Sequence, residues 1–294
     1  MFPFPYPVGS ATNVGCMSQD VDVVVVGLGV GGEEVAGRLA EAGLSVVGVE
    51  PRLVGGECPY FACVPTKMMV RAAGMLAEAR RMPTVAGSAE VRPDWSLVAR
   101  RIREEATDDW DDRVAVERFT GKGGRFVRGR ARLVGPRRVE VNGEEYEASR
   151  GVVLATGTEP AVPPIPGLEG SGHWTNREAV AVTEVPESLI VLGGGAVGLE
   201  MAQVFARFGA RVTVVEALDR LLANEEPEAS ELAADVLRRE GLDVRVGARA
   251  EEIRVADGTF TVRLAGGAGV TGDRRSISNR SSLNNAMPSS LAME

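Results

Sequence analysis

Apolar and polar residues follow a regular pattern in the first part of the chain, and that pattern predicts a strand, a helix and a second strand. The stretch DVVVVGLGVGGEEVAGRLAEAGLSVVGVE starts at Asp22 and opens with four consecutive valines. An unbroken apolar run of this kind is typical of a strand that is buried on both faces. The glycine-rich turn after it leads into an amphipathic helix, and a second apolar run ends at Glu50.

The same order of features returns in the second half of the chain. SLIVLGGGAVGLEMAQVFARFGARVTVVE starts at Ser188 and again contains an apolar run, a glycine-rich turn, an amphipathic helix and an apolar run closed by an acid, Glu216. Each repeat predicts two parallel strands joined by a crossover helix. Because chance rarely repeats strand, glycine turn, helix and acid in one chain, we predict two related units.

The residues between the two repeats predict a charged helical stretch followed by strands. Val91 to Phe119 is interpreted as helical, and RFVRGRARLVGPRRVEV, which starts at Arg125, as a strand pair with its charges on a solvated face. Residues 151 to 157 are expected to form a strand that ends in a turn. Regular structure then stops at four prolines, and a crossover between domains is expected near residues 158 to 185: Pro160, Pro163, Pro164 and Pro166.

Length and composition favour two domains of the α/β class. A chain of 294 residues that is 44% hydrophobic can form two cores of ordinary size, and 36 glycines with only 5% aromatic residues fit strands and helices joined by tight turns. We predict two Rossmann-like dinucleotide-binding domains, the second inserted in the first. The expected segments are a flexible leader at 1–20, an incomplete first domain at 21–160, a crossover at 161–185, an incomplete second domain at 186–272 and a disordered tail at 273–294.

Charge and hydropathy restrict the partners and the location. The formal net charge is −8, and the arginines after residue 125 are spread between apolar residues, which argues against nucleic acid as a partner. No apolar run approaches the roughly 20 residues that a membrane-spanning helix needs, so no membrane association is expected. The N-terminus lacks the basic start and apolar core of a signal peptide, and this favours a cytoplasmic protein.

The first glycine turn has the spacing of a dinucleotide-binding loop. Gly27, Gly29 and Gly32 form G-x-G-x-x-G. In such a loop the first glycine permits the tight turn, the second lets a pyrophosphate approach the backbone, and the third lets the helix pack on the strand. Glu50 ends the next strand, where its carboxylate can accept hydrogen bonds from ribose hydroxyls.

The second glycine turn repeats this arrangement with Gly193, Gly195 and Gly198. Glu216 closes the following strand, and a carboxylate there repels the 2′-phosphate of the phosphorylated cofactor. NAD(H) is therefore favoured over NADP(H), although the nearby Arg220 would act in the opposite direction.

The stretch GGECPYFACVPTK carries Cys58 and Cys63 with four residues between them. Zinc would need two further ligands, and the remaining candidates, Cys16 and His173, lie in unrelated contexts, so no metal site is expected. A disulfide that closes so small a ring contributes little stability. In the reducing environment expected for a cytoplasmic protein, a redox role for the pair is the remaining interpretation.

Helix geometry adds a condition to the redox interpretation. Residues five apart in one regular helix have Cα atoms roughly 8 to 9 Å apart, beyond the reach of a disulfide. One cysteine must therefore leave helical geometry. Pro59 disfavours the helical conformation in the preceding residue, so we expect Cys58 to be extended and Cys63 to lie in a helical turn. A helix N-terminus beside a thiol also favours the reactive thiolate.

The order GLGVGG, GGECPYFACVPTK, ATG and GGGAVGLE resembles the pyridine nucleotide-disulfide oxidoreductases, the flavoprotein group of dihydrolipoamide dehydrogenase, glutathione reductase and mercuric reductase. The likeness covers about residues 21 to 265. It implies an FAD-dependent oxidoreductase that passes electrons between NAD(P)H and a disulfide or dithiol substrate through the cysteine pair. Hydride would pass to the flavin, electrons would pass to the disulfide, and the freed thiolate would attack an external disulfide or metal ion.

The same resemblance implies roles for individual residues. The first loop and Glu50 would hold FAD, and the second loop would hold the nicotinamide cofactor. Cys63 would lie against the flavin, Cys58 would exchange with the substrate, and Lys67 would lie near the flavin and pair with Glu200. The implied cofactor-binding residues are Gly27, Gly29, Gly32, Glu50, Gly56, Lys67, Ala155, Thr156, Gly157, Gly193, Gly195, Gly198 and Glu216.

The chain also departs from the family pattern. Relatives continue with a further FAD-binding strand and an interface domain, which brings a His-Glu dyad and supports a homodimer. Here a Ser- and Asn-rich, non-native-looking tail follows residue 273, so the chain is interpreted as shortened at its C-terminus, without the interface domain, and the usual homodimer is in doubt. Two alternative functions stay open at this point. The first is flavin-dependent electron transfer to small acceptors such as quinones, and the second is a catalytically dead dinucleotide-binding remnant.

Overall fold

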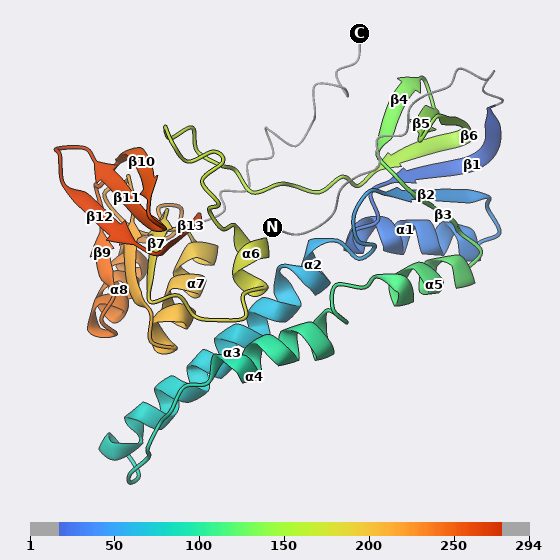
Figure 1. Ribbon diagram of the computed structural model, residues 1–294. Coiled ribbons are helices and arrows are strands. Elements are labelled where there is room, and N and C mark those ends of the chain that lie inside the picture. The colour runs from blue at the N-terminus through green and yellow to red at the C-terminus, as the bar shows by residue number, and fades with distance from the viewer. Residues whose placement is uncertain (1–17, 278–294) are drawn as a thin grey trace. The chain divides into compact units, whose positions relative to one another are not determined.

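The computed structural model describes residues 18–277 (Figure 1). These residues divide into two compact units, of which the first comprises 18–58 and 110–158 and the second comprises 59–109 and 159–277. One glycine turn lies in each unit. Cys16, the predicted leader up to residue 17 and the predicted tail from residue 278 lie outside the described residues.

A six-stranded sheet forms the centre of the first unit, in the order β3-β2-β1-β6-β5-β4. The strands β1, β2, β3 and β6 run parallel to one another, whereas β5 is antiparallel to both β6 and β4. The elements that lie wholly in this unit are β1 Gln19–Val26, α1 Val30–Glu41, β2 Val46–Glu50, α5 Arg113–Gly121, β3 Arg125–Arg128, β4 Ala131–Gly135, β5 Arg138–Val141 and β6 Glu144–Leu154.

The valine run of β1 is buried because both faces of this sheet are covered. Val23 and Val25 pack in one cluster with residues of α1 and α5, among them Phe119. Val24 packs in a second cluster on the opposite face, with Tyr146 and residues of β2 and β5. Neighbouring side chains of a strand point to opposite faces, so a strand between two apolar layers is apolar throughout.

The second unit contains a parallel four-stranded sheet, β13-β7-β8-β9, and an antiparallel sheet, β10-β11-β12. A core that includes Ile190, Val215 and Val262 joins the two sheets. The elements of this unit are α3 Cys63–Arg81, η1 Met82–Thr84, α4 Trp95–Arg101, η2 Ile102–Ala106, α6 Asn176–Val180, β7 Ser188–Leu192, α7 Ala196–Arg207, β8 Arg211–Val215, α8 Pro227–Arg239, β9 Asp243–Arg245, β10 Ala250–Ala256, β11 Thr259–Leu264, β12 Gly269–Gly272 and β13 Arg274–Ile277. A further short helix, α2 Glu57–Tyr60, spans the boundary between the units.

The helical segment 59–109 packs within the second unit, whereas the predicted segments placed it in one domain with residues 21–160. Trp95 of α4 explains this packing. Its ring lies 5.3 Å from that of Phe205 and 5.0 Å from that of Phe208, and its indole N–H donates to the Val182 carbonyl over 3.0 Å. Helix α3 also packs against α7, and the Arg80 guanidinium donates to the carbonyl of Arg207.

Two predicted elements differ in detail from the structure. The helical stretch Val91 to Phe119 is divided into α4, η2 and α5, and three consecutive residues before α5 have positive φ: Asp108, Asp109 and Trp110. The predicted arginine-rich strand pair is three strands, because β3 pairs in parallel with β2 while β4 and β5 pair with each other. Charge alternation alone did not reveal that β3 belongs to the parallel part of the sheet.

The predicted start of the disordered tail at residue 273 is wrong by several residues. β13, Arg274–Ile277, pairs in parallel with β7, with Arg274 opposite Leu189 and Ile277 opposite Leu192. The Asp273 N–H donates to the hydroxyl of Ser188 over 2.9 Å at the start of this pairing. Backbone pairing to a buried strand accepts side chains of low apolar content, and composition therefore gave a misleading signal here.

Candidate functional site

The first glycine loop has the shape that its spacing predicts. Gly27 has a φ of +91°, and a Cβ atom there would lie 2.3 Å from the Ala155 carbonyl oxygen. A Cβ atom at Gly32 would lie 2.0 Å from the Gly27 carbonyl oxygen. At Gly29 the nearest atom to such a Cβ is the Gly56 Cα at 3.9 Å, so the backbone stays open to a ligand. Helix α1 begins directly after Gly29, and its first N–H groups favour an anion at this position.

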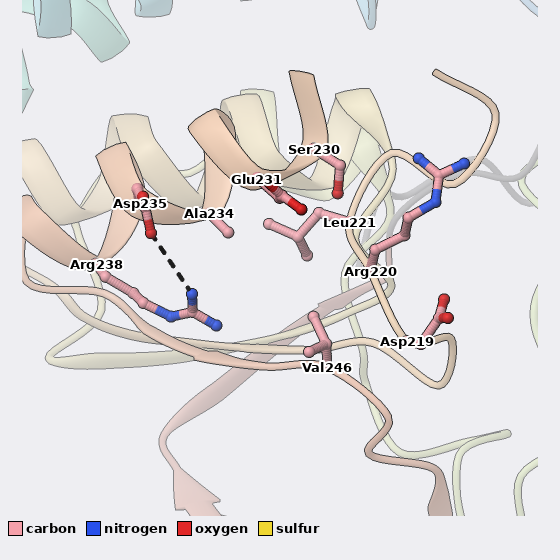
Figure 2. A pocket seen from close by; sticks show the side chains of 9 residues that line it. All are labelled: Asp219, Arg220, Leu221, Ser230, Glu231, Ala234, Asp235, Arg238 and Val246. Carbon is pink, nitrogen blue, oxygen red and sulfur yellow. Dashed lines mark ion pairs between the residues drawn. The ribbon is translucent and has the colours of Figure 1, made fainter. Parts of the chain in front are cut away.

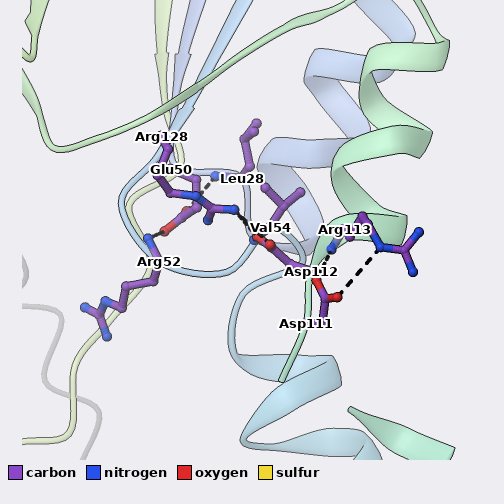
Figure 3. A network of polar contacts seen from close by, with 8 residues as sticks. All are labelled: Leu28, Glu50, Arg52, Val54, Asp111, Asp112, Arg113 and Arg128. Carbon is purple, nitrogen blue, oxygen red and sulfur yellow. Dashed lines mark hydrogen bonds and ion pairs between the residues drawn. The ribbon is translucent and has the colours of Figure 1, made fainter. Parts of the chain in front are cut away.

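Glu50 binds the backbone of the same loop. One carboxylate oxygen accepts the Leu28 N–H over 3.0 Å, and the other accepts the Arg52 N–H over 2.9 Å (Figure 3). A carboxylate has about four acceptor positions, so two bonds leave capacity for ribose hydroxyls. The predicted position of Glu50 at the end of β2 is confirmed, and the structure adds that its side chain also fixes the loop.

The segment that leads to Cys58 is attached to this glycine loop. The Gly55 N–H donates to the Leu28 carbonyl over 2.7 Å, and Gly55 forms an isolated bridge with Gly29. Gly56 has a φ of +70°, and a Cβ atom there would lie 2.8 Å from the Gly29 Cα. Any side chain at residue 56 would therefore strain the contact between the segment before Cys58 and the first glycine loop.

Asp112 is a residue of this site that sequence reasoning missed. Its buried carboxylate accepts the Val54 N–H over 2.7 Å and pairs with the Arg128 guanidinium at 2.6 and 2.8 Å (Figure 3). An acid directly before a helix usually predicts an N-cap, but the side chain of Asp112 makes no cap to α5. The contact with Val54 joins residues far apart in the chain, and no local pattern reports it.

The second loop repeats the geometry of the first. The Gly193 N–H donates to Val215 over 2.8 Å, just as the Gly27 N–H donates to Val49 over the same distance. The buried Glu216 carboxylate accepts the N–H groups of Gly194 and Leu218 over 2.6 and 2.7 Å. Leu28, Glu50 and Arg52 of the first loop thus correspond at one constant offset to Gly194, Glu216 and Leu218. Helix α7 begins directly after Gly195, and Gly198 is buried within it.

Arg220 folds the segment that follows Glu216. Its guanidinium donates to the carbonyl oxygens of Ala223 and Glu225, over 2.7 Å in each case. The Leu222 N–H donates to the Gly194 carbonyl over 2.9 Å, and the fully buried Leu221 packs against Gly194. Two guanidinium nitrogens of Arg220 therefore donate to carbonyl oxygens of its own loop.

A cavity of about 310 Å³ lies beside α8 in the second unit (Figure 2). No residue that we predicted for the site lines it. Asp235 and Arg238 form a long ion pair at its edge, at 3.9 Å. The lining residues are Asp219, Arg220, Leu221, Ser230, Glu231, Ala234, Asp235, Arg238 and Val246.

The two cysteines do not have the predicted backbone arrangement. The expectation that Cys58 is extended is wrong, because Cys58 lies in α2, while Cys63 is the first residue of α3. The break from helical geometry falls after α2, at Ala62, with φ −131° and ψ −104°. Pro59 is tolerated because it lies in the first turn of α2, where its missing N–H needs no helical partner. Cys58 is half-buried and Cys63 is exposed.

Lys67 and Glu200 lie on α3 and α7, two helices that pack together. Both side chains are exposed, and within residues 18–277 no ion pair joins them. The predicted pair is therefore not formed in this structure.

In the first unit, Ala155 donates its N–H to Val26 at the end of β6, and Thr156 follows it beside Gly27. Gly157, with a φ of +68°, completes this turn.

Residues 18–277 contain neither a membrane-spanning helix nor a cluster of metal ligands. None of the helices in residues 18–277 is long and apolar enough to cross a membrane. The same residues contain no group of three or more His, Cys, Asp or Glu side chains that could hold a metal ion.

The chain matches proteins of known sequence and structure over most of its length. Residues 21–277 match the family described as pyridine nucleotide-disulphide oxidoreductase. A dihydrolipoyl dehydrogenase of Thermus scotoductus is 37% identical over 239 residues, covering 78% of this chain and 49% of that protein. A mercuric reductase of Acidithiobacillus ferrooxidans is 34% identical over 264 residues, covering 88% of this chain and 48% of that protein.

A solved structure agrees with these relatives. The Cu(II) complex of the HOCl-induced flavoprotein disulfide reductase RclA from Escherichia coli matches with a TM-score of 0.77 at 25% identity, covering 90% of this chain and 57% of that one. The chain spans about half the length of the curated relatives it matches. The glycine loops, their acids and the family match agree, and the chain belongs to the pyridine nucleotide-disulphide oxidoreductases, an FAD-dependent family that uses NAD(P)H.

Proposed function

We propose that this protein passes electrons between NAD(H) and a disulfide or dithiol substrate through FAD and the pair Cys58 and Cys63. The repeated loop-and-acid geometry carries the proposal. Each unit holds a G-x-G-x-x-G turn whose backbone is bound by the acid that follows the next strand, Glu50 or Glu216. Two such sites in one chain fit two dinucleotides, and Cys58 follows the segment attached to the first.

The first unit fits FAD. Gly29 leaves the backbone open before α1, and the helix N-terminus there favours a pyrophosphate. Gly27, Gly32 and Gly56 occupy positions that a Cβ atom would obstruct, and Glu50 keeps acceptor capacity for ribose hydroxyls. The turn Ala155, Thr156 and Gly157 borders the same loop. Bound FAD would supply the two-electron relay between the nicotinamide cofactor and the cysteines.

The second unit would bind the nicotinamide cofactor through Gly193, Gly195 and Gly198. We propose NAD(H) as the preferred form for two reasons. The buried Glu216 carboxylate would repel a 2′-phosphate, and Arg220, the nearby cation, already donates to carbonyl oxygens of its own loop.

The cysteines supply the thiol chemistry. Cys63 is the first residue of α3, and it is exposed. We assign Cys63 to the flavin side and Cys58 to exchange with the substrate. Lys67, one turn further along α3, would place its ammonium group near the flavin. Members of the family use a disulfide substrate and form homodimers, and we propose a small-molecule disulfide as the electron acceptor here.

The test is the visible spectrum of the full chain after reconstitution with FAD, recorded before and after anaerobic NADH. We expect a bound flavin that bleaches, followed by a long-wavelength band from the Cys63 thiolate beside it. Cys58→Ser should lower disulfide reduction by more than about a hundredfold while sparing reduction of a quinone by the flavin. Cys16→Ser is the matched control and should change neither activity.

Two results would contradict the proposal. A chain that stays colourless after FAD is added would leave a dinucleotide-binding remnant. Equal disulfide reduction by the parent chain and by Cys58→Ser would place the chemistry at the flavin alone, as in an enzyme that reduces small acceptors directly.

A further inference from the structure

The cavity beside α8 has a buried hydroxyl group in its wall. Ser230 of α8 is 2% exposed and lines the cavity, and Figure 2 shows its hydroxyl pointing from the helix into that space. The Ser230 N–H donates to the Glu226 carbonyl, but within residues 18–277 the hydroxyl itself makes no hydrogen bond. Buried polar side chains nearly always have a partner, so this hydroxyl calls for one that the described chain does not supply.

The rest of the inner wall is apolar. Leu221 and Ala234 are buried, and Val246 faces them from the loop after β9 (Figure 2). Leu221 is held in place because it packs against Gly194. The volume of about 310 Å³ would hold roughly ten water molecules, and so a small organic molecule. An apolar body in this space would be removed from water against these side chains.

The charged side chains around the cavity leave an excess of negative charge. Both guanidinium groups already have acceptors, Arg220 in its own loop and Arg238 at the Asp235 carboxylate and a backbone carbonyl. In contrast, the carboxylates of Asp219 and Glu231 make no ion pair or hydrogen bond with any residue in 18–277. Unpaired carboxylates beside paired guanidinium groups favour a cation.

We propose that this cavity binds a small primary ammonium compound with an apolar body. The ammonium group would donate to the Ser230 hydroxyl and the Glu231 carboxylate, which belong to consecutive residues of α8. The hydrocarbon part would cover Leu221 and Ala234. A primary ammonium group has three donors, enough to bond both side chains at once. The site uses neither FAD nor a nicotinamide cofactor, so its test is independent of the proposed redox function.

The test is a ligand-observed NMR titration of the full chain at neutral pH with phenethylamine. We expect a dissociation constant on the order of 1 mM, as for a ligand of this size. Two probes serve as matched controls. The compound 3-phenylpropionate keeps the ring and chain with the opposite charge, and phenethyltrimethylammonium keeps the charge without any N–H donor. Both should bind at least about tenfold more weakly.

Substitutions on α8 separate the cavity from the acidic surface around it. Ser230→Ala and Glu231→Gln should each weaken phenethylamine binding by about tenfold. Glu228→Gln is the matched control, because it removes the same charge from the same helix at an exposed position outside the cavity. It should keep the parent affinity within about twofold. Ser230→Ala should not lower the melting temperature, since its hydroxyl holds no other described residue.

Four outcomes would overturn the proposed site. If phenethylamine does not bind at ten times the expected dissociation constant, the cavity takes no such ligand. Equal binding of phenethylamine and 3-phenylpropionate would show that only the apolar body is recognised. Equal losses in Glu231→Gln and Glu228→Gln would show a general attraction to a chain whose net charge is −8. A lower melting temperature for Ser230→Ala would give that hydroxyl a structural role instead.

Discussion

Carboxylates that accept backbone N–H groups organise both loops at the scale of single residues. Glu50 and Glu216 each bind one N–H of a glycine turn and one N–H two residues after themselves. Asp112 accepts the N–H of Val54 and also forms an ion pair with Arg128. Bonds from N–H groups to an ionised carboxylate are stronger than neutral ones, so these acids hold loop shapes that glycine alone leaves open.

We predict that Asp112→Ala destabilises the first unit. The substitution removes the charge partner of the exposed Arg128 and leaves the buried Val54 N–H without its acceptor, and an unsatisfied buried donor costs about 2 kcal/mol. Urea unfolding of the full chain should show this loss. Asp111→Ala removes a neighbouring acid whose side chain is 51% exposed and accepts the Arg113 N–H, and it should lower the free energy of unfolding by about 1 kcal/mol or less. Equal effects of the two substitutions would show that the buried contacts carry no special weight.

Cofactor choice is also decided at the residue scale. Glu216→Gln keeps one side-chain oxygen for one loop N–H, turns an NH2 group toward the other and removes the charge, so binding of NADPH relative to NADH should rise by about tenfold. Isothermal titration calorimetry with each cofactor measures the ratio. Arg220→Ala tests the competing role of that residue. It should weaken both cofactors alike through the disturbed loop, and a selective loss of NADPH binding would instead identify Arg220 as a ligand of the 2′-phosphate.

At the scale of elements, helix α1 depends on one glycine much more than on its neighbour. A Cβ atom at Gly32 would lie 2.0 Å from the Gly27 carbonyl oxygen, whereas one at Gly31 meets nothing within 4 Å. The close approach at Gly32 fixes how the helix leaves β1 and where its N-terminal N–H groups lie. Gly31 is an ordinary exposed helix position.

The two glycines therefore make a matched pair of substitutions. Gly32→Ala should destabilise the chain by more than about 2 kcal/mol and abolish FAD binding, because the loop must move to admit the methyl group. Gly31→Ala should be neutral or stabilising by up to about 1 kcal/mol, since alanine is the better helix former. Thermal unfolding of the apoprotein and flavin fluorescence measure the two effects. A Gly32→Ala chain as stable as the parent would contradict the packing described for α1.

At the scale of the whole molecule, the chain consists of two units that carry the same loop geometry on different sheets. The first loop lies on a six-stranded sheet and the second on a four-stranded sheet, each with a helix starting directly after the glycine turn. Ligands stabilise the state that binds them. Each cofactor should therefore stabilise its own unit.

Hydrogen exchange measured by mass spectrometry can separate these responses. FAD should protect the start of α1 and residues 51–56, and NADH should protect the start of α7 and residues 216–222. At a hundred times the dissociation constant, mass action gives about 2.7 kcal/mol of protection. Glu50→Ala should remove the FAD response and leave the NADH response intact. Protection of both units by either cofactor alone would contradict the assignment of one dinucleotide to each.

The sequence alone predicted the features that depend on short-range patterns. The valine run before Gly27 identified a strand covered on both faces, and the glycine spacing predicted a turn that only glycine can form. Both are local consequences of sterics and periodicity. Glu50 and Glu216 could also be placed at strand ends, because the carboxyl ends of parallel strands are where the turns and ligands of such folds lie.

Only the tertiary structure decided the contacts between residues far apart in the chain. The bond from Asp112 to Val54, the amide of Asn176 on Phe61 and the packing of Trp95 on Phe205 leave no periodic signal. The strand β13 was hidden for the same reason, since its place beside β7 comes from backbone hydrogen bonds rather than from apolar side chains. Local sequence determines which elements form, and the burial of distant groups against one another determines which of them meet.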